Sequence, residues 1–223
     1  MCGRFALIVS GEAVAEQFEL ADTPFLAPRY NIAPTQPVAA VRLGPHSGQR
    51  ELTHFHWGLI PSWAKDPSMS ARMINARAET VTDKPAFRAA FKRRRCLIPA
   101  SGFYEWQQIG GGKQPMFIQA QDGGLLALAG LWETWHTPDG GEIDSCTILT
   151  TAPNELMASI HNRMPVIIEP ADYDLWLYPG DRPEDGLHLL RPYPARKMAA
   201  YPVNTHVNSP RNDDARCIQP LAS

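Results

Sequence analysis

The first five residues, Met1-Cys2-Gly3-Arg4-Phe5, contain the side chain best suited to covalent chemistry. Methionine aminopeptidases remove an initiator methionine when the next residue is small, and cysteine is small enough. The mature chain would then begin with Cys2, whose α-amine and thiol lie on adjacent carbons. Such a pair condenses with an aldehyde: the amine forms an imine, and the thiolate then closes a thiazolidine ring. We expect both groups to titrate near neutral pH. The alternative is that Cys2 is an inert, small, buried side chain, which is common for cysteine.

Composition excludes several classes of protein. The chain has 223 residues, of which 44% are hydrophobic, and a net charge of -2. These values predict a soluble globular protein, and any nucleic-acid contact must come from local arginines because the net charge is not basic. No apolar run approaches the roughly 18–20 residues of a membrane span. The N-terminus also lacks the charged-then-apolar pattern of a secretion signal.

The cysteines indicate a reducing compartment. Cys2, Cys96, Cys146 and Cys217 lie far apart, and no C-x-x-C motif occurs. The sequence therefore predicts no zinc knuckle and no thioredoxin-like motif. We expect a cytoplasmic, nucleoid-associated protein in a bacterium or a nuclear protein in a eukaryote.

The elements that must position Cys2 are mostly short strands, because 21 prolines and 16 glycines predict many turns. Alternating patterns predict strands over 3–9, 38–43, 51–57, 97–98, 103–108, 115–120, 125–132 and 143–149. Helices are expected over 12–18, 85–94 and 153–160, and near 172–177. Hairpin turns are expected at 44–48, 110–112 and 122–124, a long loop at 58–77, and irregular chain at 24–37 and from 178 onward. The simplest architecture is one α+β domain built on a β core.

Four short segments place polar residues among apolar or turn residues. They are Cys-Gly-Arg-Phe at 2–5, Ile-Asn-Ala-Arg-Ala-Glu at 74–79, Ser-Gly-Phe-Tyr-Glu-Trp at 101–106 and Ile-His-Asn-Arg-Met-Pro at 160–165. Together with Arg-Tyr-Asn-Ile-Ala-Pro-Thr at 29–35 and Trp-Gly-Leu-Ile-Pro-Ser-Trp at 57–63, they resemble the SRAP family. These proteins are SOS-response-associated peptidases, also called abasic-site processing proteins. The resemblance is clearest over residues 2–170 and looser near 202–204.

The resemblance implies a fold, a reaction and a set of residues. It implies a single SRAP domain over 1–223, with a barrel-like antiparallel sheet core and peripheral short helices. Family members trap abasic sites in single-stranded DNA: the ring-opened sugar exposes an aldehyde, and the N-terminal cysteine forms a covalent thiazolidine crosslink with it. Lyase activity and a peptidase activity that removes the preceding residue are also attributed to the family. We also expect a monomer without cofactor, metal or membrane contact. The matching positions are Cys2, Asn75, Glu105 and His161 for chemistry and Arg4, Arg77 and Arg163 for DNA phosphates.

Each polar residue also has a chemical reading of its own. Glu105 lies on a predicted strand between two aromatic residues, so its side chain should point away from them. A buried carboxylate there would shuttle protons, whereas an exposed one would only be solvated. His161 suits a general acid that protonates the sugar O4′, and a structural imidazole is the alternative. Asn75 would hold the Cys2 terminus, or would bond only its own backbone as a loop residue.

Other patterns receive weaker predictions. Trp63, with Pro34 and Leu59, could form an apolar wedge that stacks on a base, although Leu59 itself is expected in the core. Trp57, Trp106, Trp132 and Trp176 are also expected in the core. The basic run 92–95 closes a predicted helix, where cations favour the C-terminal end. His54 and His56 share one strand face, but no cysteine or carboxylate completes a metal site.

Two other functions remain open from the sequence. A cysteine peptidase would use Cys2, His161 and Asn75, but the local signature of papain-like enzymes is missing. A non-catalytic single-strand binding module would need the arginines and Trp63 but not Cys2. Replacing Cys2 by alanine separates covalent capture from simple binding.

Overall fold

A closed barrel of five strands forms the larger part of the molecule. The computed structural model describes residues 2–178 and 182–221. The barrel strands, in the order in which they pair around the ring, are β10 (Glu142–Thr151), β4 (Arg50–Trp57), β3 (Pro37–Leu43), β6 (Arg95–Ala100) and β9 (Leu126–His136). The ring closes because β9 also pairs with β10. All neighbours are antiparallel except β10 and β4, which run parallel.

Two short strands extend the barrel on both sides of one end of β10. β5 (Asn75–Arg77) pairs with β10 in parallel, and β11 (Met164–Pro165) pairs with it antiparallel. Thr150 lies opposite Arg77 on one side and opposite Pro165 on the other. This register brings two of the polar sequence segments to a single residue of β10.

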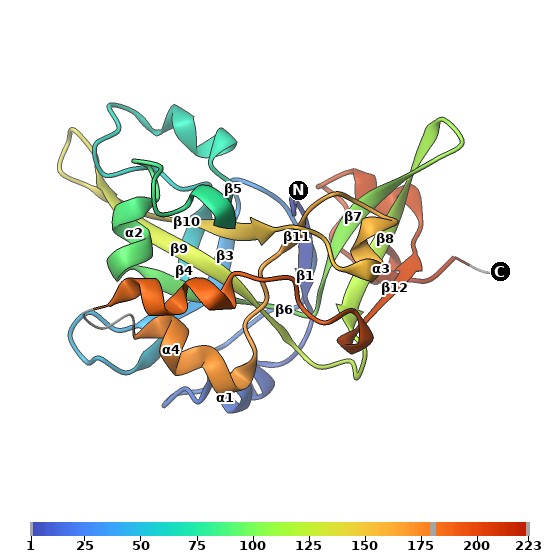
Figure 1. Ribbon diagram of the computed structural model, residues 1–223, viewed down its shortest axis with the longest axis horizontal. Helices are drawn as coiled ribbons and strands as arrows, with labels where there is room; N and C mark the ends of the chain where they lie inside the picture. Colours follow the sequence, from blue (N-terminus) through green and yellow to red (C-terminus); the bar gives the residue numbers. More distant parts are fainter. Residues whose placement is uncertain (1, 179–181, 222–223) are drawn as a thin grey trace.

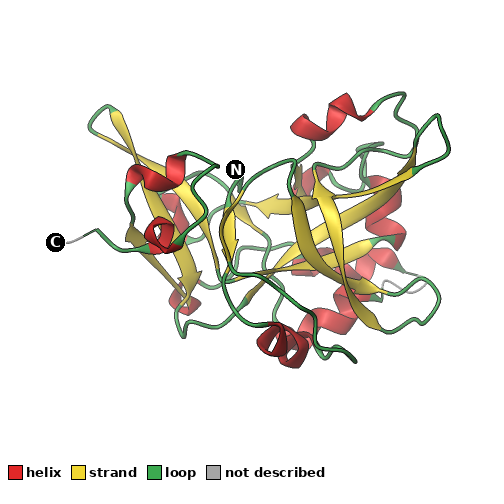
Figure 2. Ribbon diagram, turned by 180° about the vertical axis from the view of Figure 1, so that it is seen from behind, coloured by secondary structure: helices red, strands yellow, loops and turns green. Residues whose placement is uncertain are grey.

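A second sheet lies beside the barrel. Its order is β12 (Met198–Pro202), β8 (Gly112–Ala120), β7 (Gly102–Ile109), β1 (Phe5–Leu7) and β2 (Arg29–Ile32). Figures 1 and 2 show the barrel and this sheet side by side, with β1 between them. The N-terminal end of β1 lies near β5 and β11, so the first residues of the chain sit where the two parts meet (Figure 1).

Short helices cover the sheets and the connections. They are α1 (Gly11–Phe18), α2 (Arg88–Arg93), α3 (Glu155–Ala158) and α4 (Tyr173–Leu177). The 3-10 turns are η1 (Pro67–Arg72), η2 (Ala78–Thr80), η3 (Pro170–Asp172), η4 (Pro183–Leu189), η5 (Ala195–Lys197), η6 (Thr205–Asn208) and η7 (Ala215–Ile218). Ser10 precedes α1 and caps its N-terminus, because its hydroxyl accepts a hydrogen bond from the Ala13 amide at 3.4 Å. Among the described residues, no helix is both long and apolar enough to cross a bilayer.

The two faces of β7 belong to two different hydrophobic clusters. Phe103 packs in the main core with the barrel residues, whereas Tyr104 packs in a smaller cluster with Phe117 and Val203. Because side chains alternate along a strand, Glu105 shares the face of Phe103 and points toward the barrel. The prediction that Glu105 points away from Tyr104 and Trp106 is therefore confirmed.

The predicted strand pattern is largely confirmed, including the hairpin at 110–112, and so is the β-rich α+β class with a barrel core. The core was expected to be antiparallel, but β10 pairs in parallel with β4 and with β5. Residues 24–37 were expected to be irregular but contain β2; the tail contains β12, and the long loop contains η1 and β5. These strands are short. They are stabilised by pairing with strands that are distant in sequence, and their own residues carry little alternating pattern. The turn at 122–124 is not a hairpin, because β8 and β9 belong to different sheets.

The predicted helices are correct in place, but two of them are shorter than expected, and only some of the expected core residues are fully buried. The segment 153–160 contains only α3, and 85–94 only α2. Trp57, Leu59 and Trp176 are completely buried, as expected. Trp106 and Trp132 are only partly buried and pack against the edges of the clusters.

Candidate active site around Cys2

Cys2 lies three residues before β1 and is completely buried. In the register of β1 with β7, Phe5 lies opposite Phe103, and the Tyr104 amide donates to the Arg4 carbonyl at 2.9 Å. Continuing this antiparallel register by two residues brings Glu105 opposite the Cys2-Gly3 end of the strand. Glu105 is itself only 3% exposed. Strand pairing thus sets a buried thiol beside a buried carboxylate.

This environment makes the thiol hard to ionise. Burial raises the pKa of the Cys2 thiol, and the nearby Glu105 carboxylate raises it further. Near-neutral titration is the expectation for the chain without Met1, whereas in this structure both effects disfavour the thiolate. Any reaction that uses this thiol would need a base close by, and the Glu105 carboxylate lies within electrostatic reach.

Asn75 approaches from the barrel side, on β5 rather than in a loop. Its Nδ2 donates to the carbonyls of Ile74 at 3.0 Å and Ile148 at 3.4 Å. Its Oδ1 is buried and has no hydrogen-bond partner among the described residues. Phe5 packs edge-on against Trp57, whose indole Nε1 donates to the Ile74 carbonyl at 2.9 Å. These contacts connect β5 to β1 through Trp57. The Asn75 Oδ1 atom can accept a further hydrogen bond.

His161 follows α3 and has a defined ring orientation. Its backbone amide donates to the Met157 carbonyl at 2.8 Å, and its Nδ1 lies 3.0 Å from the Arg163 amide. The same Nδ1 lies 3.3 Å from the Arg163 carbonyl oxygen, which can only accept. The amide is the closer partner and can only donate, so we assign Nδ1 as the acceptor, which places the proton of a neutral ring on Nε2. Gln107 of β7 donates to the Ser159 carbonyl at 2.8 Å and so joins the strand of Glu105 to the segment of His161.

Arg4 is anchored by the C-terminal part of the chain. Its Nη1 donates to Asn31 Oδ1 at 2.7 Å and to the Val207 carbonyl at 2.8 Å. The guanidinium lies 5.7 Å from the centre of the Trp106 ring. Burial lowers the pKa of Arg4, and its Nε has no hydrogen-bond partner among the described residues. Two hydrogen bonds of Nη1 thus anchor the side chain.

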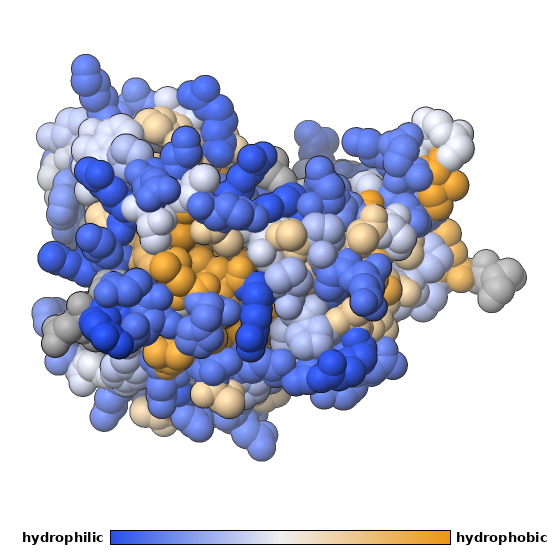
Figure 3. Space-filling view, in the orientation of Figure 1, coloured by the Kyte–Doolittle hydropathy of each residue, from blue (hydrophilic) through white to orange (hydrophobic). Residues whose placement is uncertain are grey.

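Arg77 and Arg163 flank the same end of β10. Arg77 is exposed on β5, opposite Thr150. Arg163 donates to the Thr150 carbonyl at 2.6 Å and makes a bidentate ion pair with Glu79 at 2.6 and 2.9 Å. Both arginines were predicted as phosphate contacts, and the structure places them on two sides of one residue. Around the position of the N mark of Figure 1, the surface in Figure 3 is hydrophilic.

Comparison with known proteins decides the family. The family description "SOS response associated peptidase (SRAP)" matches residues 1–210. The chain belongs to the SRAP family. The abasic site processing protein YoqW of Bacillus subtilis is 45% identical over 226 residues, which cover 98% of this chain and 99% of YoqW. The abasic site processing protein HMCES of Gallus gallus is 38% identical over 200 residues, covering 78% of this chain and 59% of that protein.

The SRAP fold also matches a solved structure. A crystal structure of a protein from Bacteroides thetaiotaomicron superimposes with a TM-score of 0.84 at 26% identity. The match covers 99% of this chain and 100% of the other. Barrel and second sheet together therefore form the SRAP architecture.

The expected wedge residues of this SRAP chain divide between surface and core. Trp63 is 58% exposed, Pro34 is half-buried, and Leu59 is completely buried. The Thr35 amide donates to the Trp57 carbonyl at 2.8 Å, which fixes the turn after Pro34 against the barrel. Leu59 is thus a core residue, as expected, and Trp63 is the residue available for stacking.

Two residues with direct contacts to the predicted site were missed from the sequence. Glu79 pairs with Arg163, and Asn31 holds Arg4. Both lie inside the segments that carry the family resemblance, 74–79 and 29–35. Their position in these motifs was the available signal, but their partners are distant in sequence.

The basic run at the end of α2 is largely structural. Arg94 pairs with Glu133 at 2.6 Å. The Arg95 guanidinium lies 4.3 Å from the ring centre of Phe91 and 4.8 Å from that of Trp176, and burial lowers its pKa to about 10. These two cations make contacts inside the fold, which agrees with the prediction that this run closes a helix.

One cluster outside the site has metal-ligating side chains. Potential ligand atoms of His206, Asp214 and Cys217 lie within 4.8 Å of one another. The carboxylate of Asp214 already accepts from Arg216 and His206, and the Cys217 thiol donates to the Asn212 carbonyl at 3.4 Å. Hydrogen bonds within the cluster account for its compactness.

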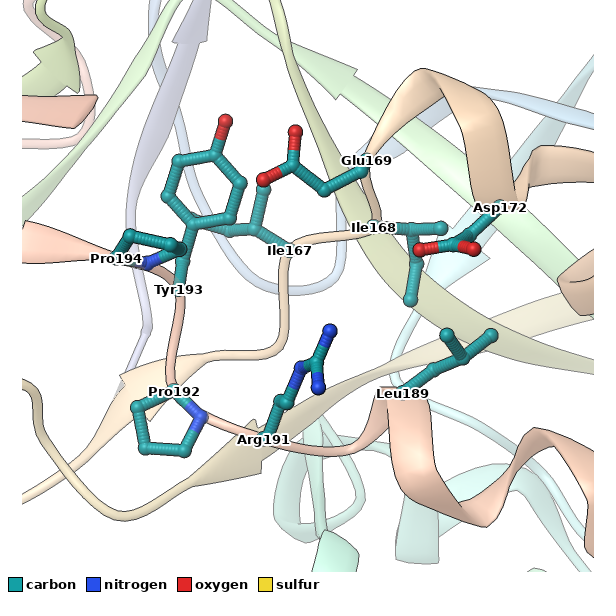
Figure 4. A pocket seen from close by; sticks show the side chains of 9 residues that line it. All are labelled: Ile167, Ile168, Glu169, Asp172, Leu189, Arg191, Pro192, Tyr193 and Pro194. Carbon is teal, nitrogen blue, oxygen red and sulfur yellow. The ribbon is translucent and has the colours of Figure 1, made fainter.

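A small cavity lies away from Cys2. Figure 4 shows its lining, in which Ile167, Ile168 and Leu189 supply the apolar wall and Arg191 and Tyr193 face Glu169. Its volume is about 100 Å³, and the predicted site residues do not line it. Figure 3 also shows an apolar hollow bordered by hydrophilic residues on the barrel half of the molecule.

Proposed function

We propose that this SRAP chain processes abasic sites in single-stranded DNA by covalent capture through Cys2. The observation that carries the proposal is the buried Cys2 thiol beside Glu105, where β1 and β7 meet β5, which begins with Asn75, and β11, which Arg163 directly precedes. The names of YoqW and HMCES support the choice of an abasic site as the substrate. The whole chain would act as one domain and as a monomer.

The capture reaction begins after removal of Met1. The Cys2 amine adds to the C1′ aldehyde of the ring-opened sugar, and the resulting carbinolamine loses the aldehyde oxygen as water to form an imine. The Cys2 sulfur then adds to the imine carbon and its proton ends on the ring nitrogen. The net reaction joins aldehyde and aminothiol with loss of one water and without oxidation or reduction.

Three polar residues have roles that follow from their positions. Glu105 accepts the thiol proton at the sulfur addition, because the raised pKa of the Cys2 thiol leaves little thiolate at rest. The Asn75 Oδ1 accepts a hydrogen bond from the Cys2 amine, which the buried oxygen requires for its own satisfaction. His161 donates its Nε2 proton to the sugar O4′, since Nδ1 accepts from the Arg163 amide.

DNA binding would use the arginines around this site. Arg4, Arg77 and Arg163 come from three segments and offer planar guanidinium groups to phosphate oxygens. Trp63, with Pro34 beside the barrel, would stack on an unpaired base. Single-stranded DNA suits such a site because its bases are free to stack.

The burial of the Cys2 thiol argues against a cysteine peptidase, which needs a thiolate before its substrate binds. Such enzymes use a thiolate prepared by a neighbouring cation, whereas Glu105 and burial oppose ionisation of Cys2. In the capture reaction the amine attacks first, so no resting thiolate is needed. Lyase cleavage would be a side reaction, in which the imine permits β-elimination of the 3′ phosphate before the sulfur adds.

The test uses a denaturing gel. Protein with Met1 removal confirmed by mass is mixed with a single-stranded oligonucleotide that contains one abasic site. We expect a band that survives denaturation for the wild type and for Cys217→Ala, and none for Cys2→Ala. Absence of the band in the wild type, or its persistence in Cys2→Ala, would refute the proposal.

A further inference from the structure

Glu79 occupies the face of Arg163 that a phosphate group would use. Its Oε1 lies 2.6 Å from Nη1 of Arg163, and its Oε2 lies 2.9 Å from Nη2. Two parallel N–H···O bonds of this kind are also how arginine binds a phosphate. The carboxylate therefore holds the position of two phosphate oxygens.

The two partners differ in how firmly they are fixed. The Arg163 side chain is 17% exposed, and its Nη2 also donates to the Thr150 carbonyl at 2.6 Å. The Glu79 side chain is 50% exposed and belongs to the short turn η2. Glu79 can rotate into solvent at low cost, whereas Arg163 stays hydrogen-bonded to Thr150 of β10. The exchange of anions at this site thus requires movement of the carboxylate only.

Glu79 also has a second cation nearby. Arg77 is close enough to lower the pKa of Glu79, although Arg163 is the main cause of that shift. Arg77 is exposed at the preceding strand, so it can share the carboxylate after release from Arg163. The two predicted phosphate contacts and Glu79 hence form one electrostatic unit.

We infer that Glu79 is an internal competitor for DNA phosphate, which occupies Arg163 in the DNA-free protein and leaves when a backbone phosphate binds. The inference rests on the proposed function, because it assumes that DNA reaches Arg163. Glu79 thereby lowers affinity for DNA in general and makes binding depend on a phosphate that fits the Arg163 fork. It is a specificity-determining residue and takes no part in the bond-forming steps.

The test is a double-mutant cycle of non-covalent binding. All variants carry Cys2→Ala, and their affinities for a single-stranded oligonucleotide with one abasic site are measured by fluorescence anisotropy at one ionic strength. Glu79→Gln should bind about three- to tenfold more tightly, because it keeps the side-chain shape and removes the competing charge. Glu155→Gln is the matched control: Glu155 is an exposed carboxylate in α3, and its loss should change affinity by less than about twofold.

The Arg163→Gln background identifies the mechanism. If Glu79 competes through Arg163, adding Glu79→Gln to the Arg163→Gln variant should raise the affinity for DNA by no more than adding the Glu155→Gln control does. Where Arg163 is intact, weaker or unchanged binding of Glu79→Gln overturns the inference. An equal gain from Glu79→Gln with Arg163 intact and with Arg163→Gln also overturns it. A parallel denaturing gel with proteins that retain Cys2 tests the proposed function separately. If the wild type forms no crosslink, the proposed function fails. If the wild type forms a crosslink, the binding data test only the role of Glu79.

Discussion

Replacing Asn31 by alanine tests how the two ends of the chain build the Arg4 site. The Asn31 side chain is completely buried. Its Nδ2 lies 3.2 Å, 3.0 Å and 2.6 Å from the carbonyl oxygens of Val207, Ser209 and Asn212. Its Oδ1 accepts from Arg4 at 2.7 Å. One amide group thus ties β2, the C-terminal segment and Arg4 together.

The expected cost follows from these contacts. The two hydrogens of Nδ2 supply two neutral hydrogen bonds, each worth about 1 kcal/mol, and the Arg4 bond is charge-assisted at about 1.5–3 kcal/mol. Asn31→Ala should therefore lower the free energy of unfolding by about 3–5 kcal/mol. In a chain of 223 residues, this loss corresponds to a fall in Tm of about 10 °C. Arg4 loses one of its anchors, so affinity for single-stranded DNA should also fall.

The assay is urea unfolding followed by tryptophan fluorescence, together with a thermal melt. Asn204→Ala is the matched control, because Asn204 is exposed and its side chain only accepts from the His206 amide at 2.8 Å. The control should lose about 1 kcal/mol, as expected for a helix N-cap. A loss below about 1 kcal/mol for Asn31→Ala, or one no larger than in the control, would refute the reasoning.

Three further predictions concern the reacting groups and the loop that holds them. Glu105→Gln should slow covalent capture by about 100-fold or more through loss of the base, while non-covalent affinity stays near that of the wild type; equal losses in both would contradict this role. In folded protein that retains Met1, Cys2 should be alkylated slowly at neutral pH, because burial raises the pKa of the thiol. The alkylation rate should still rise tenfold per pH unit above about pH 8.5, the ordinary pKa of a thiol. A rate that levels off above that pH would contradict the raised pKa. Gly58→Ala should lower the free energy of unfolding in urea by about 2–4 kcal/mol, because φ is 136° and a Cβ would lie 2.5 Å from the Ser70 carbonyl oxygen. Gly111→Ala is the control: its φ is 86° and the space around it is open, so it should lower the free energy of unfolding by about 1 kcal/mol.

The sequence predicts the strands that carry their own alternating pattern. The β7 strand and its glycine turn are clear from residues 101–112, and the direction of Glu105 follows from alternation alone. The helix α1 is clear from Ser10 and the apolar residues after it. Local pattern suffices in these cases because the signal and the structure lie within one segment.

The short strands at the site could not be predicted in this way. β5 has only three residues and exists because Ile148 to Thr150 of β10 offer it backbone partners. β12 likewise depends on pairing with β8, which lies about eighty residues earlier in the chain. Such pairings depend on distant residues, and a single sequence does not reveal them.

The site residues came from the motifs, but their partners did not. Arg163 was predicted as a phosphate contact, yet its bidentate pair with Glu79 spans 84 residues. Arg4 is held by a carbonyl 203 residues away. The sequence also predicts an easily ionised thiol at Cys2, whereas burial and Glu105 raise its pKa. Burial and long-range contacts determine these properties, and both arise only in the folded chain.

The most direct measurement is the intact mass of the protein crosslinked to an abasic oligonucleotide, with and without borohydride. The account predicts the summed masses of Met1-free protein and DNA minus one water, unchanged by borohydride, because a thiazolidine has no reducible imine. A mass that gains two hydrogens on reduction would leave Cys2 bound only as an imine. A crosslink of the predicted mass formed by protein with an acetylated Cys2 amine would contradict the role of the aminothiol altogether.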